Sequence, residues 1–154
     1  MRKRLIPHDR HEPANPPQWL DLTMATAEIS SEDPKHPIES ALLGNDEGGW
    51  RAAEPGVQRL RILFDQPQDL RRISMTFVEP AIARTQEFVL RWSRGGEAPE
   101  EIVRQQWNFS PDGTVEETED YRVGLSGATM LELTVNPDIS GSEAYASLRR
   151  LRLA

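Results

Sequence analysis

The chain contains no cysteine, only three histidines and few aromatic residues, which make up 6% of its 154 residues. The lack of cysteine excludes disulfide bonds, zinc sites built on thiolates and catalysis by a cysteine nucleophile. No apolar run approaches the roughly 18 residues that a membrane-spanning helix needs. The length is typical of one domain with a single hydrophobic core.

Positive charge is scarce after the first 18 residues. The whole chain has a net charge of −7, from 18 Lys and Arg residues against 25 Asp and Glu residues. Residues 1–18 carry a net charge of +2, so residues 19–154 carry −9. A domain this acidic repels phosphate backbones, and we therefore expect no nucleic-acid partner.

Residues 1–18 contain four of the twelve prolines and few apolar residues. Because proline lacks a backbone N–H and favours extended chain, this stretch is predicted to be a flexible tail ahead of a domain at residues 19–154. Its basic first four residues are similar to the start of a signal peptide, but no apolar segment follows them. The sequence therefore predicts a cytoplasmic protein with no membrane span.

From Trp19 onward, apolar and polar residues alternate over short stretches separated by turn residues. A period of two predicts β-strands with one buried face. The strands are expected around residues 20–29, 60–64, 73–77, 88–92, 103–109, 121–125, 131–135 and 146–153. Turns are expected at residues 65–67, 94–96, 111–113, 126–127 and 136–138, and one helical turn at residues 37–43. About eight strands at this spacing predict an all-β protein, an antiparallel jelly-roll β-sandwich.

Antiparallel strands place alternate connections at the same end of a sandwich. One end is expected to carry the connections at residues 30–56, 79–84, 110–120 and 136–145. The other end is expected to carry those at residues 65–69, 93–101 and 126–128. The first set is longer and richer in polar residues. Because long loops on a rigid scaffold often carry binding sites, the first end is the predicted binding face.

Several short stretches occur in an order that is known from one protein family. They are Ala27–Glu32, Pro37–Asn45, Gly49–Arg51, Leu60–Asp65, Leu70–Ile73, Glu87–Ser93 and Ala146–Leu151. In this order and spacing, residues 25–154 resemble the discoidin, or coagulation-factor type C, family. The resemblance implies a galactose-binding-domain-like jelly roll that is not catalytic. It also implies that loops at one end bind galactose-type sugars, phospholipid headgroups or other proteins.

Many members of that family hold a calcium ion in the loop before a tryptophan, with an aspartate ahead of a Gly-Asn pair. In this chain Leu43 stands at the aspartate position, and Gly48 and Gly49 stand where a Thr or Ser ligand would be. Calcium requires several oxygen ligands, including carboxylates. We therefore expect no metal site and no cofactor, although Asp46 and Glu47 remain alternative ligands.

The candidate ligand-binding residues are the polar and aromatic residues at the predicted binding end. They are Arg84, His36, Glu79, Asn136, Tyr145 and Trp50. Sugar hydroxyls need both donors and acceptors, and an aromatic ring such as that of Tyr145 stacks on a sugar face. Arg84 is the strongest candidate and is expected to be a loop residue with little burial, because it ends the connection at residues 79–84. Trp50 is expected first as a core residue and second as a ligand contact, and Trp92 and Trp107 are expected in the core.

The sequence offers little for catalysis. The segment Gly124–Gly127 lacks the spacing of a nucleophile elbow, and no set of catalytic roles can be assigned. The histidines of the segment His8–Glu12 lie among prolines that argue against a helical metal site, so this segment is predicted to be solvated tail. The acidic cluster Glu116–Asp120 is predicted to be a solvated loop or a protected strand edge.

These patterns predict a non-catalytic binding module whose ligand is a carbohydrate or another small polar molecule. The alternative is an intracellular protein–protein adaptor. The missing signal peptide favours the adaptor, because sugar-binding modules are usually exported. The sequence leaves open which sugar or protein binds and which oligomeric state the chain adopts.

Overall fold

The computed structural model describes residue 3 and residues 18–44 and 48–154. The described residues form eight strands and one short helix. In chain order these are β1 (Thr26–Ile29), α1 (Glu39–Leu42), β2 (Trp50–Pro55), β3 (Gln58–Val78), β4 (Arg84–Ser93), β5 (Glu100–Phe109), β6 (Glu116–Asn136), β7 (Tyr145–Leu148) and β8 (Arg150–Leu153). The predicted tail lies outside the described residues, apart from Lys3 and Gln18. Nothing in the described part of the chain is a helix long enough to cross a membrane.

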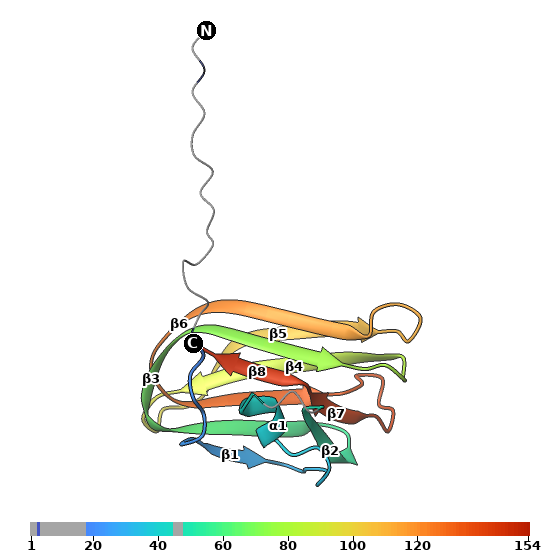
Figure 1. Cartoon of the computed structure of the whole chain (residues 1–154), viewed down its shortest axis with the longest axis horizontal. Coiled ribbons are helices and arrows are strands. Elements are labelled where there is room, and N and C mark those ends of the chain that lie inside the picture. The colour runs from blue at the N-terminus through green and yellow to red at the C-terminus, as the bar shows by residue number, and fades with distance from the viewer. Residues whose placement is uncertain (1–2, 4–17, 45–47) are drawn as a thin grey trace.

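Two long strands, β3 and β6, form the frame of the sandwich. Each has 21 residues, and they pair antiparallel from Gln58 opposite Val135 to Val78 opposite Glu116. Figure 1 shows them curving together at the left edge of the view, from one layer of the sandwich into the other. Each strand therefore contributes one half to each layer.

The bend corrects two predicted turns. Residues 65–67 and 126–127 lie inside β3 and β6, where the register shifts but the two strands stay together. Gly127 has a φ of +69°, and its N–H donates to Asp69 Oδ1 at 2.8 Å. Turn-type residues therefore produce bulges that bend the ribbon sharply and do not end the strands.

Both layers are antiparallel throughout. The six-stranded sheet, which the bend divides between the two layers, has the order β1-β3-β6-β4-β5, and β8 pairs with the second half of β3 across Ile73–Thr76. β2 and β7 form a separate two-stranded sheet. The predicted all-β, antiparallel jelly-roll sandwich is confirmed.

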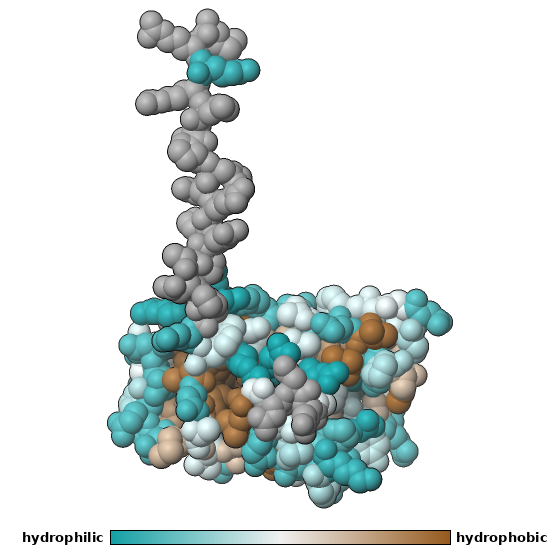
Figure 2. Space-filling view, in the orientation of Figure 1, coloured by the Kyte–Doolittle hydropathy of each residue, from teal (hydrophilic) through white to brown (hydrophobic). Residues whose placement is uncertain are grey.

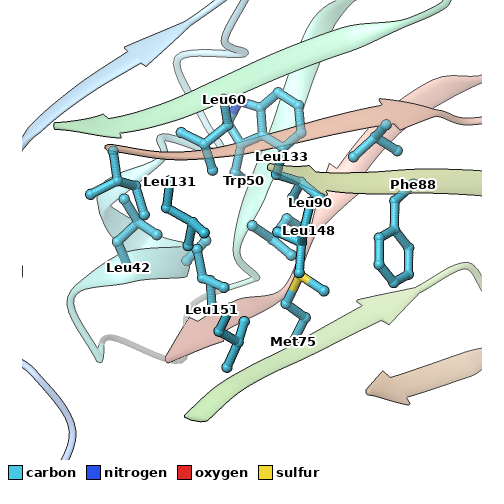
Figure 3. Close-up of a cluster of buried hydrophobic side chains, with 14 of the residues drawn as sticks. Leu42, Trp50, Leu60, Met75, Phe88, Leu90, Leu131, Leu133, Leu148 and Leu151 are labelled. Atoms are coloured by element: carbon cyan, nitrogen blue, oxygen red, sulfur yellow. The ribbon is translucent and has the colours of Figure 1, made fainter. Parts of the chain in front are cut away.

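The core follows the alternation seen in the sequence. Leu60 and Ile62 in the first half of β3, and Met75 and Phe77 in the second half, are almost fully buried. Figure 3 shows side chains of this cluster between the strands, among them Trp50, Leu60, Met75, Phe88, Leu133 and Leu151. Trp92 and Trp107, both expected in the core, are partly buried and pack against it. Hydrophilic side chains cover most of the face in Figure 2, with hydrophobic areas between them.

The last expected strand, at residues 146–153, is divided in two. β7 pairs with β2, whereas β8 pairs with β3, so the chain changes sheets at Arg149. The N–H of Arg149 donates to the carbonyl of Thr76 at 2.9 Å. This crossing holds Arg149 beside the end of β3.

Candidate functional site

A cleft of about 240 Å³ opens at the predicted binding end of the sandwich. Its lining residues are His36, Gly48, Trp50, Arg51, Val78, Glu79, Pro80, Tyr145, Ser147 and Arg149. Four of the six candidate ligand-binding residues, His36, Glu79, Tyr145 and Trp50, are thus brought together. We call this hollow the cleft from here on.

The cleft draws on three of the four expected connections. These are the connections around residues 30–56, 79–84 and 136–145, although they are far apart in sequence. The fourth contributes no lining residue, and it is shorter than predicted because β6 already begins at Glu116. In Figure 1 the connections that follow β3, β5 and β6 all lie at the right of the view, away from the bend.

His36 is held at the cleft by backbone contacts on both sides. Its N–H donates to the carbonyl of Asp33 at 2.8 Å, and its own carbonyl accepts from the N–H of Arg51 at 3.1 Å. Gly48 lies against the ring: a Cβ there would be 3.5 Å from His36 Nδ1, and the φ of Gly48 is +88°. The imidazole is therefore placed by fixed backbone and can offer a donor and an acceptor to a ligand.

Gly49 sets how closely β2 approaches the end of β7. Its φ is +70°, and a Cβ there would lie 2.3 Å from the carbonyl oxygen of Leu148. Only glycine fits such a backbone approach. The contact brings Trp50 opposite Leu148 in the β2–β7 pair, so it aligns the two strands that carry Arg51 and Tyr145.

Arg51 and Tyr145 stand beside each other at the rim. The guanidinium carbon of Arg51 lies 5.4 Å from the centre of the Tyr145 ring, a cation–π distance. Tyr145 is 39% exposed, so part of the ring is open to a ligand. Both residues also line a second hollow of about 500 Å³, together with His36, Asp33, Pro34, Ala52 and Ala53.

Arg84 is not the exposed loop residue that the sequence predicts. It is the first residue of β4 and is 4% exposed. Its Nε donates to Glu79 Oε1 at 2.8 Å, one terminal nitrogen donates to the carbonyl of Pro137 at 2.8 Å, and the guanidinium lies 4.7 Å from the centre of the Phe109 ring. An arginine surrounded in this way has no donor to offer at the surface. It instead fixes Glu79, which does line the cleft.

The two remaining candidates are Trp50, in the core, and Asn136, at the end of β6. Trp50 is 2% exposed, and its Nε1 donates to the carbonyl of Ser31 at 3.1 Å, so the expected core role is confirmed. Asn136 ends β6, where its Oδ1 accepts from the N–H of Asp138 at 3.3 Å. Asn136 does not line the cleft.

Three polar residues of the cleft were missed from the sequence: Arg51, Ser147 and Arg149. Arg51 follows buried Trp50, so strand alternation alone predicts that its side chain points away from the core. Arg149 lies inside the single strand expected at residues 146–153. The crossing between β7 and β8, which turns it toward the cleft, has no signal in the alternation.

The acidic cluster at residues 116–120 forms the start of β6 and not a loop. In this half of β6, pairing is seen with β3 alone, which matches the expected strand edge. Glu117 departs from both expectations, because it is fully buried and accepts from Gln86 Nε2 at 3.4 Å. Burial, together with the neighbouring Glu119 carboxylate, raises the pKa of Glu117 to about 8.

The connection after β6 is ordered by a carboxylate. Asp138 is buried and accepts hydrogen bonds from the hydroxyl of Ser140 and that of Ser142, each at 2.6 Å. These hydrogen bonds, led by that from Ser140, lower the pKa of Asp138 to about 2. The carboxylate therefore stays ionised and keeps this loop in shape beside Tyr145.

Within the described residues, no group of three or more His, Asp and Glu side chains is arranged to hold a metal ion. Asp46 and Glu47, the alternative calcium ligands, lie outside the described residues, as do His8 and His11.

No protein-family model and no curated protein sequence matches the chain. Among solved structures it is similar to the CBM32-3 module of a family 31 glycoside hydrolase from Clostridium perfringens. The TM-score is 0.63 at 20% identity, over 88% of this chain and 93% of that one. The chain has the fold of these carbohydrate-binding modules.

Two further solved structures share this fold. The family 32 module of C. perfringens NanJ, solved in complex with galactose, matches with a TM-score of 0.59 and 15% identity, over 88% of this chain and 96% of that one. Reduced XRCC1, solved bound to the catalytic domain of DNA polymerase β, matches with a TM-score of 0.61 and 15% identity, over 89% of this chain and 98% of that one. The galactose-binding-like sandwich thus occurs in proteins with different partners, so the residues of the cleft must carry the argument about function.

Proposed function

We propose that the chain is a non-catalytic carbohydrate-binding module and that the cleft is its sugar site. The observation that carries the proposal is the arrangement of His36, Arg51, Glu79 and Tyr145 around one hollow at the loop end of the sandwich. The fold that the chain shares with solved carbohydrate-binding modules supports it.

The chemistry of the cleft suits a sugar. Arginine guanidinium groups donate to hydroxyls, a carboxylate accepts from them, and the imidazole of His36 does both. The exposed part of the Tyr145 ring offers an apolar face for the C–H side of a pyranose ring. A shallow rim of this kind binds without enclosing its ligand.

The same arrangement argues against catalysis. Glu79 is the carboxylate of the cleft, and its two oxygens accept from Arg84 Nε at 2.8 Å and from the N–H of Ala81 at 3.2 Å. A carboxylate held in an ion pair is a poor general acid, and no second carboxylate lines the described cleft for the paired-acid chemistry of glycoside hydrolysis. We therefore propose binding without turnover.

A glycan array followed by titration calorimetry tests the proposal. The first probes are galactose and galactose-terminated oligosaccharides, because one solved structure with this fold holds galactose. Tyr145→Ala and Arg51→Ala are each expected to raise the Kd at least about tenfold, the effect of losing a stacking face or a charged hydrogen-bond donor.

Arg94→Ala is the matched control. Arg94 also lies 5.4 Å from the centre of an aromatic ring, that of Trp92, but in the connection after β4 at the other end of the sandwich. Its removal is expected to leave the Kd unchanged. If no glycan binds, or if binding survives Tyr145→Ala and Arg51→Ala but not Arg94→Ala, the cleft is not a sugar site. A protein captured through Arg51 and Tyr145 would then favour the adaptor function.

A further inference from the structure

Two arginines of the cleft differ from most other arginines in the described part of the domain. Most arginines in the described residues pair with carboxylates: Arg59, Arg61, Arg72, Arg84, Arg91, Arg94 and Arg104. Within the same described residues, neither Arg51 nor Arg149 forms such a pair, and both line the cleft. Residues 19–154 have a net charge of −9, so two uncompensated cations in one hollow stand out against their surroundings.

The carboxylate in the cleft does not cancel this charge. Glu79 is bound to the buried guanidinium of Arg84, so the Glu79–Arg84 pair is neutral as a unit. Among the described lining residues, Arg51 and Arg149 then leave the cleft with a formal surplus of two positive charges. A local surplus of this kind attracts an anion.

The second hollow has no such surplus of positive charge among its lining residues. It shares Arg51 with the cleft, but it adds the carboxylate of Asp33 and the aliphatic side chains of Pro34, Ala52 and Ala53. An anionic group is therefore favoured in the cleft, near Arg149, over the second hollow. The Arg51–Tyr145 pair lies on the border, because both residues line both hollows.

From this asymmetry we propose that the ligand is an acidic saccharide, with its carboxylate or sulfate group in the cleft and a neutral neighbouring sugar in the second hollow. The proposal rests on the carbohydrate-binding function proposed above. Arg149 supplies the donors that select the anion, and Arg51 and Tyr145 contact both sugars.

Pairs of saccharides that differ only in charge test the proposal. Oligogalacturonides are compared with their methyl esters, and sulfated galactan oligosaccharides with the desulfated forms, by titration calorimetry at low and high salt. The acidic member of at least one pair is expected to bind about tenfold more tightly or better, and to weaken as salt rises. The pair that binds identifies the anion as carboxylate or sulfate.

Substitutions at Arg149 separate charge from shape. Arg149→Gln is expected to weaken binding of the acidic member about tenfold and to leave the neutral member unchanged, whereas Arg149→Lys retains most of the preference. Arg94→Gln, at the other end of the sandwich, is expected to change neither. Thermal unfolding of each variant checks that the fold is intact.

Three outcomes would overturn the proposal. The first is a neutral member that binds as tightly as its acidic counterpart, and the second is a preference for the acidic member that survives Arg149→Gln. Either result rules out the acidic saccharide as the preferred ligand. If binding still depends on Tyr145, the carbohydrate-binding function stands. If no saccharide of either kind binds, the carbohydrate-binding function itself fails and the inference fails with it.

Discussion

Gly49 is a single residue on which the geometry of the whole cleft depends. Its backbone touches the last residues of β7, and it immediately precedes Trp50, the first residue of β2. A side chain at this position would push β2 and β7 apart. The rim residues Arg51 and Tyr145 would then lose their contact.

Gly49→Ala is expected to destabilise the fold by more than about 3 kcal/mol, because it combines a strained positive φ with a backbone clash. Gly56→Ala is the matched control: Gly56 has a φ of +88°, but nothing lies within 4 Å of its would-be Cβ. Its cost is expected to be about 1–2 kcal/mol, from the positive φ alone. Urea denaturation measures both, and equal losses would contradict the role given to the backbone contact.

Single residues are also where prediction from the sequence was weakest. Strand alternation placed Glu79 and Tyr145 at the binding end, and both line the cleft, although Tyr145 is the first residue of β7 and not a loop residue. Arg84 follows a loop in the sequence, yet the Phe109 ring, the Pro137 carbonyl and Glu79 surround it. Phe109 and Pro137 lie far from Arg84 in the chain, so the local pattern around Arg84 could not reveal its burial.

At the scale of elements, β6 combines two environments in one strand. Its second half lies between β3 and β4 in the six-stranded sheet. Its first half is acidic and turns Glu117 into the core, opposite Phe77 of β3. A buried carboxyl group of this kind links the stability of the strand to pH.

The free energy of unfolding is expected to fall as pH rises from about 4.5 to about 8. The Glu117 carboxyl has an ordinary pKa of 4.5 and a folded-state pKa of about 8, so the folded chain binds the extra proton between these values. That stabilising contribution is complete below pH 4.5 and is lost as pH rises through 8.

Glu117→Gln should therefore flatten the fall in Tm with pH and raise Tm at pH 8 by about 5 °C, because glutamine keeps the shape without the charge. Glu116→Gln, an exposed neighbour on the same strand, serves as the control and should leave the pH profile unchanged. A Glu117→Gln profile parallel to that of the unaltered protein would mean that Glu117 is ionised in the folded state.

Elements were predictable wherever alternation was regular. The two halves of β3 and of β6 were expected as separate strands, because both contain residues that usually form turns. The residues at the bend could not show by themselves that the partner strand bends at the same place, which is what keeps β3 and β6 paired around it. The turn-type residues are present, but the pairing of β3 with β6 makes them a bend within two continuous strands.

At the scale of the whole molecule, the boundary between tail and domain can be tested by deletion. Removing residues 1–16 is expected to change Tm by less than about 5 °C, because this segment has no apolar pattern that could be buried. Removing residues 1–22 should lower Tm clearly, because it also removes buried Leu22 and the hydrogen bond from the Leu20 N–H to the Leu153 carbonyl, at 2.7 Å.

Differential scanning calorimetry measures both deletions. A large loss of Tm in the shorter deletion would show that the tail packs on the sandwich. An unchanged Tm in the longer one would move the start of the domain beyond Leu22.

The pairing of Trp50 with Leu148 has a consequence during translation. Chains grow from the N-terminus, and an early strand cannot pair with a late one that the ribosome has not yet released. Gln58 of β3 likewise cannot pair with Val135 of β6 until Val135 has been released. The nascent chain therefore exposes the apolar faces of β2 and β3 until their late partners, β7 and β6, have been released.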